Sequence, residues 1–408
     1  MWRLMLRIFF LLIITVLLGG FTTAAAPSAP DDVPLGTPIL AFDTAAQDAI
    51  WLYDLQNRTA RQLSFGDEQH RVWGFSPDGC RVLFTLGRSP THIRAYSARL
   101  NGDDVREVAR FASPPSGVWS IWEPQWSPDA ANPRIAFTFI RYTPNNSDGF
   151  DTDHRIAWVD ASAANGYGGE PAFYSVTGDE HTARWSFDGA RLIYVSYEER
   201  PAGADPFSTA VPNSPVTSTL READIWMVDA DGSNKRRVTD FPVGSVSMPR
   251  WSPDGDLIGF VYSPSPNNDQ IWMIGSAAGS IPTQLSYATA LALDLSWFSD
   301  STAMVASLRD FRGAAENRLW RIPLVGIADN EAEEILSDPA SSYLDYPRYS
   351  SDGRFLAFRS AYALGLMDFS GASGIENISG LLPDTFDGNT PPVWSPSVFT
   401  GESSCGGQ

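Results

Sequence analysis

A short phrase that recurs along the chain most constrains its fold. The clearest copy reads PRWSPDG at residues 249–255, and the apolar run LIGFVY follows almost directly. Related copies stand at 73–79, 124–130, 183–189, 295–301 and 347–353, and a shorter one, PVWSPS, at 392–397. The aligned aspartates of the six longer copies are separated by 46 to 66 residues. Self-similarity at such a period is typical of a repeat fold.

Each repeat predicts four short strands. The phrase at 249–255 is followed by apolar runs at 258–261, 271–276 and 283–286, with turn residues between them. Four short strands per repeat are typical of a β-propeller blade. The runs are apolar on consecutive residues, as expected where neighbouring blades cover both faces of a sheet. Many of the 14 tryptophans recur at equivalent places, and we expect them to fill the space between blades.

The two ends of the chain are expected to share a blade. Residues 39–64 contain three strand-like runs with no copy of the phrase before them, and the copy at 392–397 has no such runs after it. We therefore predict an all-β fold, a seven-bladed β-propeller of four-stranded blades whose last blade is split between the chain ends. Six blades are the alternative. Joining the ends would remove the open edges of the ring.

The same closure predicts a disulfide bond. The copy at 392–397 needs no hairpin turn, so the chain continues as a tail beside the first full blade, whose own turn ends in Cys80. The second of the two cysteines, Cys405, lies in this tail. We predict a Cys80–Cys405 bond, with two free thiols as the alternative.

The N-terminal segment predicts export. Two arginines precede an apolar run at 8–21, and small residues follow it, a pattern typical of a secretory signal peptide. We divide the chain into a signal peptide (1–25), a linker (26–36), the propeller (37–398) and a C-terminal tail (399–408). A periplasmic or extracellular protein is expected, or a membrane-anchored one if the segment is retained.

The charge of the chain restricts its partners. The formal net charge is −19, whereas nucleic-acid binding requires a basic surface. Nucleic acid is therefore not expected as a partner, and neither is an anionic membrane surface once the signal peptide is removed.

Linear motifs for chemistry are scarce. The recurring Ser-Pro-Asp-Gly is interpreted as a hairpin turn, because equivalent turns spread around a ring cannot converge on one substrate. The four histidines form no ligand-spaced pair and look too dispersed to converge on a metal. We expect no cofactor. Asp148, Asp151 and Asp153 stand close together in the sequence and form a calcium candidate, with a solvated loop as the alternative.

The connections between strands predict a functional face. The longer ones, at 139–155, 199–223 and 309–317, fall on the same side of the ring as the links between blades, and loops on a rigid scaffold commonly carry function. Several side chains just before the innermost strands are expected at the mouth of the central channel: Arg71, Trp122, Glu123, Glu180, His181, Asp294 and Asp345. An acidic, partly aromatic mouth would suit a cationic peptide, a sugar or a metal ion.

WSPDG followed by an apolar run, together with VDADGSNKRRVT at 228–239, resembles the repeat of TolB-type propellers. The resemblance covers about 360 residues and implies exported proteins that bind other proteins or small ligands. It applies to the propeller part only. We identify no N-terminal α/β domain of the TolB kind, and neither the G-x-S-x-G elbow nor the hydrolase domain of prolyl-oligopeptidase-like enzymes.

Two classes of function therefore stand side by side. The first is an exported, non-catalytic propeller that binds a protein, a glycan or another cell-envelope ligand through its loop-rich face and channel mouth. The alternative is a propeller enzyme, a lyase or glycan hydrolase that uses Glu123, Glu180 or His181 in the channel mouth. A third possibility is a propeller that serves only as a scaffold in a larger assembly.

Overall fold

The computed structural model describes residues 35–405, with gaps at 45, 47, 112–117, 146–148, 163–168, 175–178, 202–218, 266–267, 287–289, 311–316, 325–331, 337–342, 362, 370–374 and 379–389. The predicted signal peptide (1–25) and most of the predicted linker lie outside the described residues. Within the described ranges, no helix has the length and apolar character that crossing a membrane requires.

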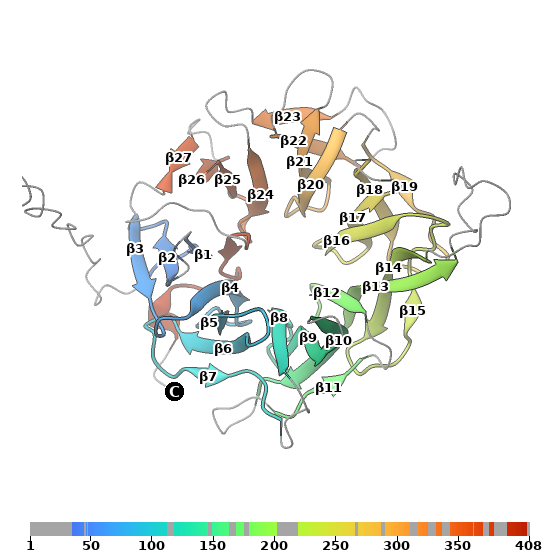
Figure 1. Ribbon diagram of the computed structural model, residues 1–408. Helices are drawn as coiled ribbons and strands as arrows, with labels where there is room; N and C mark the ends of the chain where they lie inside the picture. Colours follow the sequence, from blue (N-terminus) through green and yellow to red (C-terminus); the bar gives the residue numbers. More distant parts are fainter. Residues whose placement is uncertain are drawn as a thin grey trace, which may run out of the picture.

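The described chain forms antiparallel β-sheets arranged around a central opening, which is a propeller arrangement (Figure 1). The predicted all-β class and the four-stranded sheets are confirmed. Five sheets contain four strands each, and a sixth contains eight. The larger sheet consists of two runs of four strands, which are joined by a single parallel pair, Ala223 with Ser245.

Within each four-stranded sheet except the first, and within each half of the larger sheet, chain order runs from the channel outward (Figure 1). The first sheet contains β28 (Val393–Trp394), β1 (Ile39–Asp43), β2 (Ile50–Asp54) and β3 (Thr59–Leu63). The next contains β4 (Gln69–Phe75), β5 (Arg81–Gly87), β6 (Arg94–Arg99) and β7 (Arg106–Glu107). The third contains β8 (Val118–Trp126), β9 (Arg134–Pro144), β10 (Phe150–Asp160) and β11 (Ala172–Phe173).

The remaining sheets repeat this plan. The eight-stranded sheet contains β12 (Glu180–Trp185), β13 (Arg191–Pro201), β14 (Thr219–Asp229), β15 (Arg236–Arg237), β16 (Ser245–Trp251), β17 (Leu257–Ser263), β18 (Gln270–Gly275) and β19 (Thr283–Gln284). The last two contain β20 (Ala290–Trp297), β21 (Ala303–Asp310), β22 (Asn317–Pro323) and β23 (Glu333–Leu336), then β24 (Leu344–Tyr349), β25 (Phe355–Ser360), β26 (Ala363–Asp368) and β27 (Ile375–Asn377).

One sheet joins residues from both ends of the described chain, as the repeats predict. Strand β28 pairs antiparallel with β1, so that Trp394 lies opposite Leu40 and Val393 opposite Ala41. The hydroxyl of Ser395 accepts a hydrogen bond from the amide of Ile39 at 3.0 Å. These contacts close the ring, and they give hydrogen-bond partners to the otherwise open edge of β1.

The predicted tail packs against the sheets beside this closure. Phe399 is 1% exposed and belongs to the same hydrophobic cluster as Phe84. A short 3-10 helix, η3 (Glu402–Ser404), follows it, and Glu402 forms an ion pair with Arg61 at 3.0 Å. Cys405 is bonded to Cys80, with 5.5 Å between their Cα atoms.

Tryptophans of the inner strands tie neighbouring sheets together. The indole N–H of Trp251 donates to the carbonyl oxygen of Arg184 at 3.1 Å, and that of Trp297 donates to Arg250 at 3.0 Å. Trp394 donates in the same way to Arg348 at 2.9 Å. Each indole therefore holds one backbone position of the previous inner strand.

A buried carboxyl near the ring closure predicts a pH-dependent stability. Asp43, at the end of β1, is fully buried and accepts a hydrogen bond from the Thr390 hydroxyl. Burial raises the pKa of Asp43 to about 7, against opposing effects of Thr390 and Arg71. Between pH 4 and 7 the folded state therefore binds this proton more tightly than the unfolded state, and rising pH removes that stabilisation.

We expect Asp43→Asn to abolish this contribution. The free energy of unfolding of D43N should rise relative to wild type as pH increases from 4 to 8, by up to about 4 kcal/mol. Urea unfolding of both proteins at several pH values measures the difference. Asp103→Asn, an exposed change in the turn after β6, should leave the wild-type profile intact. A D43N-to-wild-type difference that does not vary with pH would contradict the expectation.

Candidate functional site

Four inner strands carry the same irregularity where they face the channel. In β8, β12, β16 and β24, two residues oppose one residue of the next strand, which is a β-bulge. The first bulged residue has a left-handed backbone: Glu123 (φ 48°), Thr182 (φ 59°), Met248 (φ 52°) and Tyr346 (φ 53°). Non-glycine residues rarely adopt this conformation, which costs about 1–3 kcal/mol each and tends to cluster at functional sites. A bulge also re-aims the side chains that follow it.

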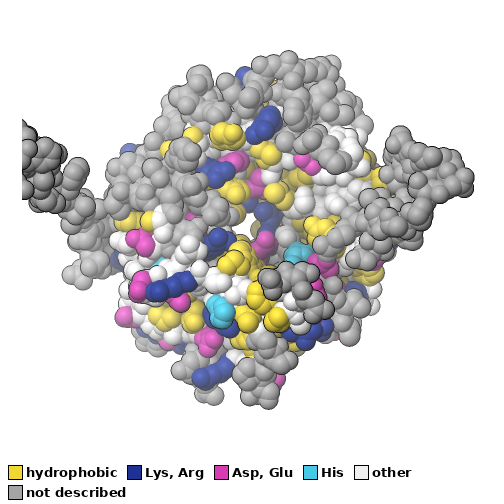
Figure 2. All heavy atoms as spheres, in the orientation of Figure 1, with side chains coloured by type: hydrophobic (Ala, Val, Ile, Leu, Met, Phe, Trp, Pro, Cys, Tyr) yellow, Lys and Arg dark blue, Asp and Glu magenta, His cyan; other side chains and the backbone are white. Residues whose placement is uncertain are grey.

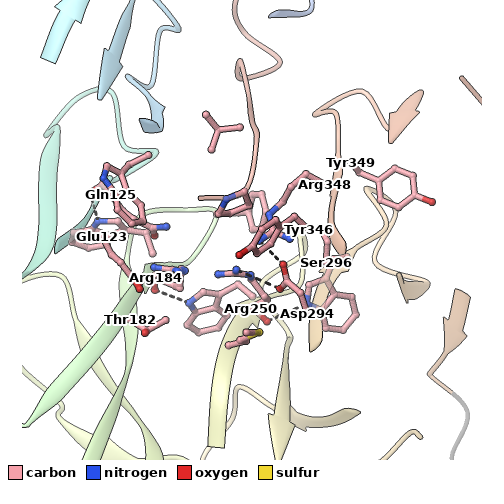
Figure 3. A pocket seen from close by; sticks show the side chains of 18 of the residues that line it. Glu123, Gln125, Thr182, Arg184, Arg250, Asp294, Ser296, Tyr346, Arg348 and Tyr349 are labelled. Atoms are coloured by element: carbon pink, nitrogen blue, oxygen red, sulfur yellow. Dashed lines mark hydrogen bonds and ion pairs between the residues drawn. The ribbon is translucent and has the colours of Figure 1, made fainter. Parts of the chain in front are cut away.

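Three arginines follow these bulges and converge on the channel. Arg184, Arg250 and Arg348 each occupy the position just before the aromatic residue of the recurring phrase. They extend from β12, β16 and β24 into one cavity (Figure 3). The equivalent positions in the other inner strands hold Gly74, Gln125, Ser296 and Val393, which are small or uncharged.

Two carboxylates partly balance these arginines. Asp294, 2% exposed, lies 2.9 Å from the Arg348 guanidinium and 3.8 Å from that of Arg250. Glu123 pairs with Arg184 at 3.1 Å. Burial, and then the positive charges of Arg184 and Arg348, lower the pKa of Arg250 to about 9, against the opposing effects of Asp294 and Glu123. Arg250 therefore keeps its charge at neutral pH, although its charged form is disfavoured.

The cavity has a volume of about 760 Å³, within the range typical of small-molecule sites. Figure 2 shows the molecule hollowed at its centre, with charged side chains around the opening. Aromatic rings make up much of the wall: Trp73, Trp185, Trp251, Trp297, Phe187, Tyr197, Tyr346 and Tyr349. The charged groups that line it are three arginines and two carboxylates. The expectation of an acidic mouth is therefore wrong, because the inner-strand arginines outnumber the acids.

The structure separates the predicted mouth residues into three groups. Glu123, His181 and Asp294 line the cavity. Arg71 and Trp122 lie together elsewhere, the guanidinium 5.0 Å from the centre of the indole ring. They line a second, smaller pocket between β4 and β8.

The third group is held in buried ion pairs beside the channel. Asp345 accepts two hydrogen bonds from Arg359, both at 2.7 Å. Glu180 is 1% exposed and lies 3.5 Å from the Lys235 ammonium. These contacts give both carboxylates a structural role in the described fold.

Two of the four histidines meet, although the sequence separates them by 27 residues. Nδ1 of His154, on β10, lies 2.8 Å from Nε2 of His181, on β12. An oxygen of Asp179 lies 2.8 Å from the His181 nitrogen and 3.4 Å from the His154 nitrogen. Burial lowers the pKa of His181, against opposing effects of Glu123 and Glu180. The neutral imidazole, which is the form that binds metals, is therefore favoured. The expectation that the histidines are too dispersed to meet is corrected for this pair.

The calcium candidate is only partly described. Asp148 lies outside the described residues. Asp153 forms ion pairs with Arg155 at 2.8 Å and Arg141 at 3.2 Å, and Asp151 accepts a hydrogen bond from the Asn145 side chain at 3.2 Å. Two arginines therefore already neutralise one of the expected oxygen ligands.

The loop-rich face includes two extended hairpins. Strands β9 and β10 have 11 residues each, as do β13 and β14. Most other strands have eight or fewer, so these hairpins continue beyond the ring. His154 lies on one of them, next to the channel-lining strand that carries His181.

The sequence analysis missed three residues of the cavity wall, the arginines Arg184, Arg250 and Arg348. The sequence did contain a signal for these arginines, because all three occupy the same position when the repeats are aligned. This shared position gives no hint of function while each copy is considered alone. It becomes meaningful only when equivalent positions are known to face one axis.

No protein-family model matches the chain. Over 247 residues, the chain is 24% identical to the uncharacterized peptidase YuxL of Bacillus subtilis (strain 168), an alignment that covers 60% of this chain and 30% of that protein. The chain thus spans about a third of the length of this relative.

Two solved structures are similar to this chain. Oligogalacturonate lyase from Vibrio parahaemolyticus is 15% identical with a TM-score of 0.51, and the match covers 84% of this chain and 86% of that one. TolB from Acinetobacter baumannii is 14% identical with a TM-score of 0.46, over 88% and 82% of the two chains. At 15% identity, the similarity to the oligogalacturonate lyase shows a shared fold alone.

Proposed function

We propose that this chain is an exported, non-catalytic propeller of the TolB-like kind that binds an anionic ligand in its central channel. We count seven blades, taking the eight-stranded sheet as two. The observation that carries the proposal is the convergence of Arg184, Arg250 and Arg348 on one cavity of about 760 Å³. Guanidinium groups recognise carboxylates through paired hydrogen bonds.

The ligand class follows from the chemistry of the wall. Asp294 is shared between two arginines, so the lining carries one more positive than negative charge. The aromatic rings offer flat apolar surfaces that suit the faces of sugar rings. A carboxylate-bearing sugar or a short acidic peptide combines both features, and a uronic-acid oligosaccharide of the cell envelope or its surroundings is the ligand we favour.

The test is a calorimetric titration with trigalacturonate, beside an uncharged trisaccharide. Wild type should bind the charged sugar, more weakly as salt concentration rises, and should not bind the uncharged one. Arg184→Met should weaken binding at least tenfold. Arg88→Met is the matched control, because Arg88 is exposed and pairs with Asp67 away from the channel. Equal binding by R184M and wild type would refute the channel as the site.

A lyase is the second candidate. Its specific support is that His181 and Tyr346, two groups able to transfer protons, line the same cavity as the arginines. β-Elimination from a uronic acid needs a neutralised carboxylate and a base near the adjacent C–H bond. Ultraviolet absorbance of an unsaturated product, followed with wild type and trigalacturonate, separates the two: turnover supports the lyase, and binding without turnover supports the non-catalytic protein.

A further inference from the structure

We propose that His154, Asp179 and His181 form a binding site for one divalent transition-metal cation of the zinc class in the wall of the channel. The site involves residues of two neighbouring sheets and the connection between them. It is independent of the anionic ligand proposed above.

The geometry of the three atoms supports a cation. The nitrogens of His154 and His181 and one Asp179 oxygen form a triangle with sides of 2.8, 2.8 and 3.4 Å. An ion about 2.1 Å from each atom would lie about 1 Å out of the plane of the triangle. Ligand atoms in tetrahedral zinc sites are about 3.4 Å apart, so small side-chain movements would complete the arrangement.

Hydrogen bonding alone accounts poorly for the same contacts. If Nε2 of His181 donates its proton to Asp179, that nitrogen has no lone pair left to accept a proton from His154. One proton would then have to serve two acceptors. A cation instead accepts a lone pair from all three atoms at once, which explains why they converge.

The surroundings favour an accessible, open site. The side chains of His154, Asp179 and His181 are 18%, 19% and 29% exposed, so an ion can enter. His181 also lines the cavity, which leaves a coordination position for water or a ligand on the channel side. Two imidazoles and one carboxylate with an open position are typical of zinc, manganese and iron(II) sites that bind small molecules.

The charges near the cluster also favour a cation. Glu123 and Glu180 both act electrostatically on His181, and Glu123 also pairs with Arg184, the channel arginine on the same strand as His181. Both cysteines are in a disulfide, so a thiolate does not compete for the metal in the oxidised protein.

The test is titration of the tag-free, disulfide-bonded chain with Zn²⁺, without sugar or peptide. We expect one ion per chain, and an absorption spectrum typical of nitrogen and oxygen ligands when Co²⁺ replaces Zn²⁺. His154→Gln and Asp179→Asn should each weaken binding at least tenfold and change that spectrum. His92→Gln is the control, because His92 contacts Thr91 in a turn of another sheet.

Melting curves in EDTA show whether the variants fold. Since Asp179→Asn keeps the size and shape of the side chain, this variant tests ligation even if a histidine variant unfolds. Wild type that binds no stoichiometric Zn²⁺, or H154Q and D179N variants that bind as tightly as wild type, would overturn the proposal. Neither result bears on trigalacturonate binding, which depends on Arg184.

Discussion

Asp294→Asn should lower the free energy of unfolding by about 3 kcal/mol or more. Asp294 is the carboxylate shared by Arg250 and Arg348, and its side chain is 3% exposed. Removing one partner of a buried ion pair leaves the other charge uncompensated, which typically costs about 3–5 kcal/mol. The cost should be high here because Arg184 adds a third positive charge, and the pKa of Arg250 is already lowered. Denaturant unfolding at neutral pH measures the change.

A matched control and a compensating second substitution test this expectation further. Asp300→Asn changes an exposed carboxylate in the turn after the same strand, where it accepts hydrogen bonds from Thr302. It should change stability by less than about 1 kcal/mol. Adding Arg250→Met to D294N should recover part of the loss, because it removes one of the opposed positive charges. If D294N were as stable as D300N, the arginines would not depend on this carboxylate.

Breaking the Cys80–Cys405 bond should produce the second large effect. The two cysteines are 325 residues apart, and loop entropy alone predicts a stabilisation of about 6 kcal/mol. The C-terminal segment is also held by Phe399 in the core, the Glu402–Arg61 ion pair and a hydrogen bond from the Leu35 amide to Glu402. These contacts persist without the bond, so the double variant Cys80→Ser, Cys405→Ser should lose about 2–4 kcal/mol.

Two measurements examine this bond. Non-reducing mass spectrometry of the oxidised protein should find no free thiol, and urea unfolding should give a lower midpoint for the double serine variant. Wild type treated with a reductant should shift toward the midpoint of that variant, while the variant itself should not respond. Two free thiols in the oxidised protein would contradict the bond, whatever the unfolding curves show.

The repeat allowed the architecture to be predicted from the sequence. Strands, turns and their order depend on local patterns, such as apolar runs and the Ser-Pro-Asp-Gly turn. In four copies of the recurring phrase that end in Asp-Gly, the glycine has a φ between 70° and 76°: Gly79, Gly189, Gly255 and Gly353. The pairing of β28 with β1 could also be inferred, because each chain end lacks what the other supplies. The closeness of Cys80 and Cys405 follows from the same closure.

The chemistry of the channel could be predicted only in part. Glu123, His181 and Asp294 line the cavity, but its lining carries more positive than negative charge, contrary to the expectation. A bulge in each of four inner strands inserts an extra residue, which changes the side chain that faces the axis. The expectation took side chains just before the innermost strands, which selects several acids and overlooks Arg184, Arg250 and Arg348, which follow the bulges.

The sequence by itself determined the class of fold, the strands of each sheet, the closure of the ring and the pairing of the cysteines, because all of these follow from repetition and from the complementary chain ends. Only the tertiary structure decided which charges meet. Arg184 and Arg348 are 164 residues apart, and His154 and His181 belong to different sheets. Such groups interact because the ring brings separate strands to a common axis. No pattern within one repeat encodes how close the side chains of different repeats lie.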